Sequence, residues 1–139
     1  MQCIRYEYDV DGENFASAGN ASESVKRTLK QMGVSAASVR RVAIAMYEGE
    51  INMVIHAHGG KAIAEVYPDR IEITLKDSGP GIADIELAMK AGYSTATENI
   101  RSLGFGAGMG LPNMKKYSDE MRIESTVGVG TTVFLRIDF

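Results

Sequence analysis

The sequence has a single cysteine, Cys3, among its 139 residues, which excludes an internal disulfide. It also has no excess of basic residues: 15 Lys and Arg stand against 18 Asp and Glu, which leaves no positive field for wrapping a nucleic acid. No apolar run approaches the roughly 18 residues needed to cross a bilayer, and the chain does not open with a charged-then-apolar leader. These absences predict a cytoplasmic protein that has neither a nucleic acid nor a membrane as its partner.

The residues that are present suit one hydrophobic core. Hydrophobic residues make up 45% of the chain and charged residues 24%, a normal globular balance that supplies one core but not two. No repeat, linker or low-complexity segment divides the sequence. We therefore expect a single domain over residues 1–139.

Hydrophobic periodicity predicts strands at both ends of the chain with helices between them. Strands are expected over 3–10, 62–67, 70–77, 121–126 and 131–139. Helices are expected over 20–32, 35–57, 83–91 and 111–119. The glycine-rich stretch 92–110 has no strong periodicity and is expected to form a long loop. This order favours an α/β two-layer sandwich, in which helices pack on one face of a mixed sheet.

Two polar residues of the second predicted helix, Glu48 and Asn52, lie four positions apart and therefore share one face. The rest of the helix is apolar almost all round, and an unpaired polar group buried there would cost about 1 to 3 kcal/mol. One interpretation is catalytic: Asn52 supplies an amide oxygen to Mg²⁺, and Glu48 polarises a hydroxyl or water that attacks a γ-phosphate. The alternative is an exposed helix edge, because the E-x-x-x-N pattern is common by chance.

Asp77 lies on the face of the predicted strand 70–77 that carries its apolar residues. Its carboxylate therefore points as the core residues do and needs hydrogen-bond donors. Gly79 and Gly81 remove side chains beside it, which leaves room for a flat ligand such as adenine, whose amino group would fit Asp77. The alternative is a simple turn, since Asp-Ser-Gly-Pro-Gly is common turn chemistry.

A third segment, Gly104 to Leu111, is rich in glycine and comes directly before a predicted helix. Free amides and the helix dipole at such a place can bind phosphate. The segment is not a P-loop, because no Gly-Lys-Ser/Thr follows it. The alternative is a lid-like loop without a ligand.

Taken together, the three segments resemble the N, G1 and G2 boxes of the GHKL ATPase family, in order and in element type. Gly130-Thr131, before the last strand, resembles the late threonine that joins the adenine-binding aspartate in that family. The resemblance covers essentially the whole chain and implies the Bergerat ATP-binding fold. It also implies ATP and Mg²⁺ as ligands, with 92–110 as the ATP lid.

Residue by residue, the resemblance implies a base, a metal ligand and a set of nucleotide contacts. Glu48 would be the base and Asn52 the Mg²⁺ ligand. The expected nucleotide contacts are Asn52, Asp77, Gly79, Gly81, Gly106, Gly108, Gly110, Leu111 and Thr131. Lys90 or Arg101 is a candidate for steadying the γ-phosphate, against the alternative that both are ordinary solvated charges.

The segment from Ala88 to Thr95, the short lid and the helix ending in Tyr117-Ser-Asp-Glu120 resemble stand-alone anti-sigma factor and switch protein serine/threonine kinases. That branch implies phosphorylation of a serine or threonine on a STAS-type antagonist domain, or binding of a sigma factor in the alternative state. It is also compatible with a homodimer. Two alternatives stay open: a non-catalytic module whose lid is gated by nucleotide, and a plain ATPase of the same fold. Gly49, inside the buried helix, departs from helix propensity by about 1 kcal/mol, and close packing is one reason for a glycine there.

Overall fold

The computed structural model describes residues 3–12, 18–57, 59–82, 84–89 and 110–139. Most of the predicted lid therefore lies outside the described residues. So do four of the candidate functional residues, which are Lys90, Arg101, Gly106 and Gly108.

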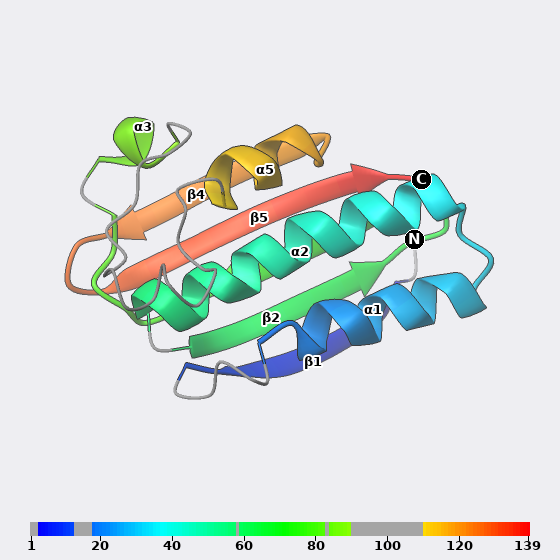
Figure 1. The fold of residues 1–139 in the computed structure, drawn as a ribbon, viewed down its shortest axis with the longest axis horizontal. Coiled ribbons are helices and arrows are strands. Elements are labelled where there is room, and N and C mark those ends of the chain that lie inside the picture. The colour runs from blue at the N-terminus through cyan, green and yellow to red at the C-terminus, as the bar shows by residue number, and fades with distance from the viewer. Residues whose placement is uncertain (1–2, 13–17, 58, 83, 90–109) are drawn as a thin grey trace.

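Five strands form one sheet in the order β1-β2-β3-β5-β4. Figure 1 shows β1 and β2 at one side of the sheet and β5 and β4 at the other. They are β1 (Ile4–Asp11), β2 (Gly59–Val66), β3 (Arg70–Lys76), β4 (Glu120–Thr126) and β5 (Gly130–Asp138). Period-two alternation explains them. Every second residue of β3 is buried, at Ile71, Ile73 and Leu75, whereas in the edge strands β1 and β4 half-buried residues alternate with exposed ones. β2 begins earlier than predicted, since Gly59 and Gly60 pair with β1 instead of only ending the preceding helix.

All four neighbouring strand pairs are antiparallel, so the prediction of a mixed sheet was wrong in this respect. β3 and β4 run in the same direction, but β5 lies between them and pairs with both. β1 and β2 are joined through two successive helices, which return the chain in the opposite direction. The connections between strands thus leave no parallel neighbours in this sheet.

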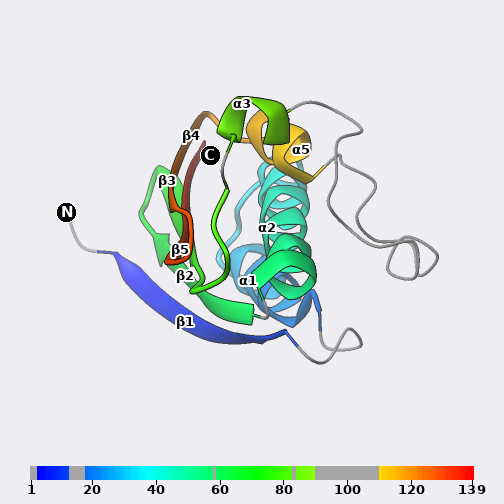
Figure 2. The same cartoon turned by 90° about the vertical axis from the view of Figure 1, so that its left-hand side faces the viewer.

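The described helices are α1 (Asn20–Gln31), α2 (Ala36–Ala57), α3 (Ile85–Ala88) and α5 (Gly110–Lys116). Figure 2 shows α1, α2 and α5 on one face of the sheet, which confirms the predicted two-layer arrangement. α5 ends before the predicted boundary, because the Asp119 amide already donates to the Arg136 carbonyl of β5 at 2.8 Å. No helix of the described segments is long and apolar enough to span a bilayer.

The core lies between the buried stripe of the helices and the inner face of the sheet. Leu29 of α1, Met46 of α2 and Leu135 of β5 are fully buried within it. Gly49 is also buried in α2, where an added Cβ would overlap Leu75 Cδ1 and lie 3.1 Å from Met114 Cε. Close packing of α2 on β3 and α5 therefore accounts for a glycine inside this helix.

Candidate functional site

The ends of several elements meet at one end of the molecule, at the left in Figure 1. α2 ends there, β2 and β5 begin, β3 ends, and α5 begins after the predicted lid segment. The Asp77 amide donates to the Thr131 carbonyl at 3.0 Å, which ties the end of β3 to the start of β5. Most of the candidate residues that the structure describes come from these element ends, while Glu48 and Asn52 lie in the second half of α2.

Asp77 follows the last residue of β3 and is half-buried. Its Oδ1 accepts hydrogen bonds from the Gly79 amide at 2.9 Å and the Thr131 amide at 3.1 Å. The Gly79 bond is that of an Asx turn, so the turn interpretation is correct for the local backbone. Both described hydrogen bonds go to Oδ1, which leaves Oδ2 as an acceptor for a ligand.

Thr131 is buried on the inner face of β5, on the same side of the strand as Val133, Leu135 and Ile137. Its hydroxyl lies 2.8 Å from the Ser125 hydroxyl of β4. Ser125 also accepts a hydrogen bond from the Ile82 amide at 2.7 Å, so it joins the loop after β3 to both strands of the closing hairpin. The sequence analysis did not identify Ser125. Its position was a usable signal, because Ser125 is a polar residue on the same face of the strand as Met121 and Ile123.

The loop after β3 is held between α2 and the β4–β5 hairpin. A Cβ on Gly79 would lie 2.6 Å from Ala57 Cβ at the end of α2. Gly81 has a φ of +80°, and a Cβ there would lie 2.5 Å from the Thr126 carbonyl oxygen. The Gly128 amide of the hairpin donates to the Pro80 carbonyl at 2.8 Å. Both glycines therefore allow backbone segments to approach closely beside Asp77.

Glu48 and Asn52 face the first turns of α5, and both are half-buried rather than exposed. Asn113 Nδ2 lies 3.5 Å from Glu48 Oε1, and Asn52 Nδ2 lies 4.0 Å from Met114 Sδ. A Cβ on Gly110 would lie 2.9 Å from both Asn52 Nδ2 and Oδ1. The structure thus brings the Glu48 carboxylate and the Asn52 amide together with α5, the helix that follows the predicted lid segment.

Two more residues of α5 complete this part of the site. Leu111 packs its side chain against the hydrophobic core, beside the Gly110 backbone. Asn113 was missed in the sequence analysis, although it lies three positions after Gly110 and therefore on the same side of a helix. A polar residue at that spacing from a glycine-rich segment is the signal that could have found it.

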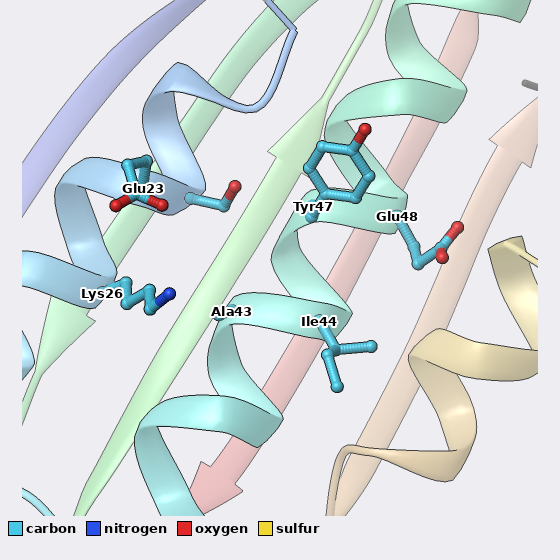
Figure 3. Close-up of a pocket in the computed structure, with 7 residues that line it drawn as sticks. Glu23, Lys26, Ala43, Ile44, Tyr47 and Glu48 are labelled. Atoms are coloured by element: carbon cyan, nitrogen blue, oxygen red, sulfur yellow. The ribbon is translucent and has the colours of Figure 1, made fainter. Parts of the chain in front are cut away.

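A cavity of about 270 Å³ lies beside Glu48, between α1 and α2 (Figure 3). α1 contributes polar and charged side chains to it, and α2 contributes mainly apolar ones. The residues that line the cavity are Ser22, Glu23, Lys26, Ala43, Ile44, Tyr47 and Glu48. Glu48 therefore contacts α5 through Asn113 and also lines this cavity.

Within the described ranges, no group of three or more His, Cys, Asp or Glu side chains is arranged to hold a metal ion. Mg²⁺ bound with a nucleotide keeps several waters and takes phosphate oxygens, so it needs only one or two protein ligands. The amide oxygen of Asn52, four residues from the carboxylate of Glu48, is a hard oxygen donor of the required kind. The residues present therefore fit Mg²⁺ that arrives with a phosphate ligand.

Comparison with known proteins gives a consistent result. The family described as histidine kinase-like ATPase domain matches residues 13–137. The anti-sigma F factor of Halalkalibacterium halodurans is 30% identical over 131 residues, covering 86% of each chain. The serine/threonine-protein kinase RsbT of Bacillus subtilis is 31% identical over 112 residues, covering 78% of each chain.

A solved structure shares the fold. It contains the RsbU and RsbW domains of Rv1364c from Mycobacterium tuberculosis, and the match has a TM-score of 0.61 at 14% identity. The alignment covers 96% of this chain but only 32% of that longer chain. This likeness concerns the architecture of one domain.

Proposed function

Because the chain belongs to the histidine kinase-like ATPase domain family, we propose that it is an ATP-dependent serine/threonine kinase. The proposed substrate is a hydroxyl of a STAS-type antagonist domain, and the proposed alternative partner is a sigma factor. The names of the anti-sigma F factor and RsbT relatives support the kinase activity and the sigma factor, and the STAS-type acceptor follows from the resemblance of the sequence to switch-protein kinases. The observation that carries the proposal is the meeting of Glu48 and Asn52 with the start of α5, at the same end of the sheet as Asp77.

The nucleotide is proposed to bind across this end of the sheet. Oδ2 of Asp77 would accept a hydrogen bond from the adenine amino group, while Oδ1 stays on its two backbone amides. Thr131 would support the same contact through its hydroxyl. The proposed backbone contacts are Gly79, Gly81, Gly106, Gly108, Gly110 and Leu111. Lys90 and Arg101 stay candidates for the γ-phosphate.

The chemistry requires a base, and Glu48 is the proposed one. As the acceptor oxygen bonds to the γ-phosphorus and the bond to the ADP oxygen breaks, Glu48 would take the proton of the attacking hydroxyl. Mg²⁺, held by Asn52, would neutralise charge on the phosphate oxygens. Asn113 would orient Glu48 through the Nδ2 group that lies 3.5 Å from Oε1. A cytoplasmic location and a homodimer are part of the same proposal.

Substitution of Glu48 by Gln tests the proposal. Wild-type protein incubated with γ-labelled Mg·ATP and the STAS-domain proteins of its source genome should label a serine or threonine of one of them. Glu48→Gln should keep its affinity for Mg·ATP and lose about 100- to 10,000-fold in the rate of phosphoryl transfer, because it lacks the base. Glu124→Gln, an equal charge change at an exposed position of β4, is the control.

The other outcomes separate the alternatives. A wild type that holds a partner in a nucleotide-dependent way without labelling it would be a binding module. Release of phosphate from ATP at the same rate with and without every protein substrate would indicate a plain ATPase. Either result would contradict the kinase assignment while leaving the nucleotide site in place.

A further inference from the structure

Glu50 is the one charged side chain that is buried within the described segments, at 2% exposure. Its Oε2 accepts hydrogen bonds from the Gly19 amide at 3.1 Å and the Ala21 amide at 3.2 Å. Its Oε1 accepts one from the Ser22 amide at 2.5 Å. A buried carboxylate is costly unless both oxygens are bonded, so these three amides account for its burial.

The three amides belong to the beginning of α1, which has no cap of its own. Gly19 precedes the helix in a left-handed conformation, with φ of 95°, and no side-chain cap bond forms there. The first amides of a helix lack partners within the helix, and the dipole favours a negative charge beside them. Glu50 of α2 thus supplies the hydrogen-bond acceptors that a capping side chain of α1 would otherwise provide. It thereby fixes where α1 begins relative to α2.

The beginning of α1 is also one wall of the cavity beside Glu48. Ser22 lines this cavity together with Tyr47 and Glu48 of α2 (Figure 3). Gly19 packs under the Tyr47 ring, because a Cβ on it would lie 2.9 Å from Tyr47 Cε1. The bonds from Glu50 therefore hold Gly19 against the Tyr47 ring and Ser22 in the wall of the cavity.

We propose that Glu50 is a positioning residue for the phosphoryl acceptor. It keeps the α1 wall of the cavity at a fixed distance from Glu48, so that an acceptor segment entering between α1 and α2 presents its hydroxyl to that base. Residues two positions apart in a helix project roughly 200° from each other. Glu50 accordingly faces away from Glu48, toward the amides of α1. It therefore positions the wall that the acceptor contacts and does not contact the nucleotide. This inference rests on the proposed kinase function.

Glu50→Gln tests the role, because it keeps the size of the side chain but turns one acceptor oxygen into an NH₂ group facing the amides of α1. We expect faster hydrogen exchange at the Gly19, Ala21 and Ser22 amides. With the STAS-domain protein that the wild type labels, the KM for this acceptor should rise about tenfold. The Kd for Mg·ATP should stay within about twofold of the wild-type value.

A second variant alters the same wall and leaves the Glu50 side chain itself unchanged. Gly19→Ala places a methyl group against the Tyr47 ring and should give the same rise in acceptor KM with unchanged Kd for Mg·ATP. Gly33→Ala is its matched control, because Gly33 has a similar φ of +81° but nothing within 4 Å of the added Cβ. Gly19→Ala decides the matter if Glu50→Gln does not fold.

Each result bears on the positioning role. Unchanged amide exchange or an unchanged acceptor KM in both variants would overturn it. So would an equal loss of affinity for acceptor and nucleotide, which indicates a general structural role. A wild type that labels no acceptor would refute the kinase function and the positioning role with it, whereas an active wild type with unaltered variants would refute the positioning role alone.

Discussion

At the scale of single residues, Gly81 lies where the loop after β3 approaches the backbone of Thr126, beside the proposed nucleotide site. Gly81→Ala should be destabilising for two reasons: a left-handed φ costs an L-residue about 1 to 2 kcal/mol, and the new methyl group would press on the Thr126 carbonyl oxygen, 2.5 Å away. Because the loop beside Asp77 would have to move, affinity for ATP should fall as well. Urea unfolding and nucleotide titration measure the two effects.

The neighbouring hairpin offers the control for this prediction. Gly128 also has a φ of +80°, but an added Cβ would find nothing within 4 Å. Gly128→Ala should therefore show only the cost of the backbone conformation and no change in ATP affinity. Equal losses of stability in the two variants would show that the contact between Gly81 and Thr126 is unimportant.

At the scale of elements, an ion pair joins α2 to the end of the sheet opposite the site. Asp119 Oδ2 accepts hydrogen bonds from the Asp138 amide at 2.7 Å and from Arg41 Nη2 at 2.8 Å. The Asp138 amide, and then the Arg41 guanidinium, lower the pKa of Asp119 below its usual value. A carboxyl group with a lowered pKa in the folded state stabilises the protein above its unfolded pKa, and this contribution disappears as the pH falls through the folded pKa.

Asp119→Asn should therefore unfold at a lower urea concentration than the wild type at pH 7. The difference between the two proteins should shrink below about pH 4, where the unfolded aspartate becomes protonated, and vanish below the folded pKa. Asp9→Asn is the control, since Asp9 is 89% exposed and its Lys61 partner lies 3.8 Å away. A difference for Asp119→Asn that is the same at pH 7 and pH 2 would contradict the assignment.

The helices and strands are largely predictable from the sequence, because apolar residues recur at a regular spacing on the buried face of each element. The inward parity of Thr131 is visible in this way, and so is the shared face of Glu48 and Asn52. Strand order is not visible, because the position of β5 between β3 and β4 depends on contacts between distant segments. Glu50 was missed for a similar reason: the amides that satisfy it belong to another helix.

At the scale of the whole molecule, α2 contacts the Asp119 ion pair, the beginning of α1, the beginning of α5 and the loop beside Asp77. Near its beginning, Arg41 binds the end of the sheet through Asp119. In its second half, Glu50 anchors α1, while Glu48 and Asn52 face α5. Its last residue, Ala57, packs against Gly79 of the loop beside Asp77. One helix thus carries the proposed base and metal ligand and, through Glu50, holds the α1 wall of the cavity.

The proposed nucleotide binds at the end of the sheet where Asp77 lies. Calorimetric titration of ATP, with and without Mg²⁺, tests it on the wild type and on Asp77→Asn. Asn keeps an oxygen for the Gly79 and Thr131 amides, so the fold should remain. Its NH₂ group would instead meet the adenine amino group, donor against donor, and we expect an affinity loss of about 100-fold. A wild type that binds no nucleotide, or an Asp77→Asn variant that binds as tightly as the wild type, would contradict the account.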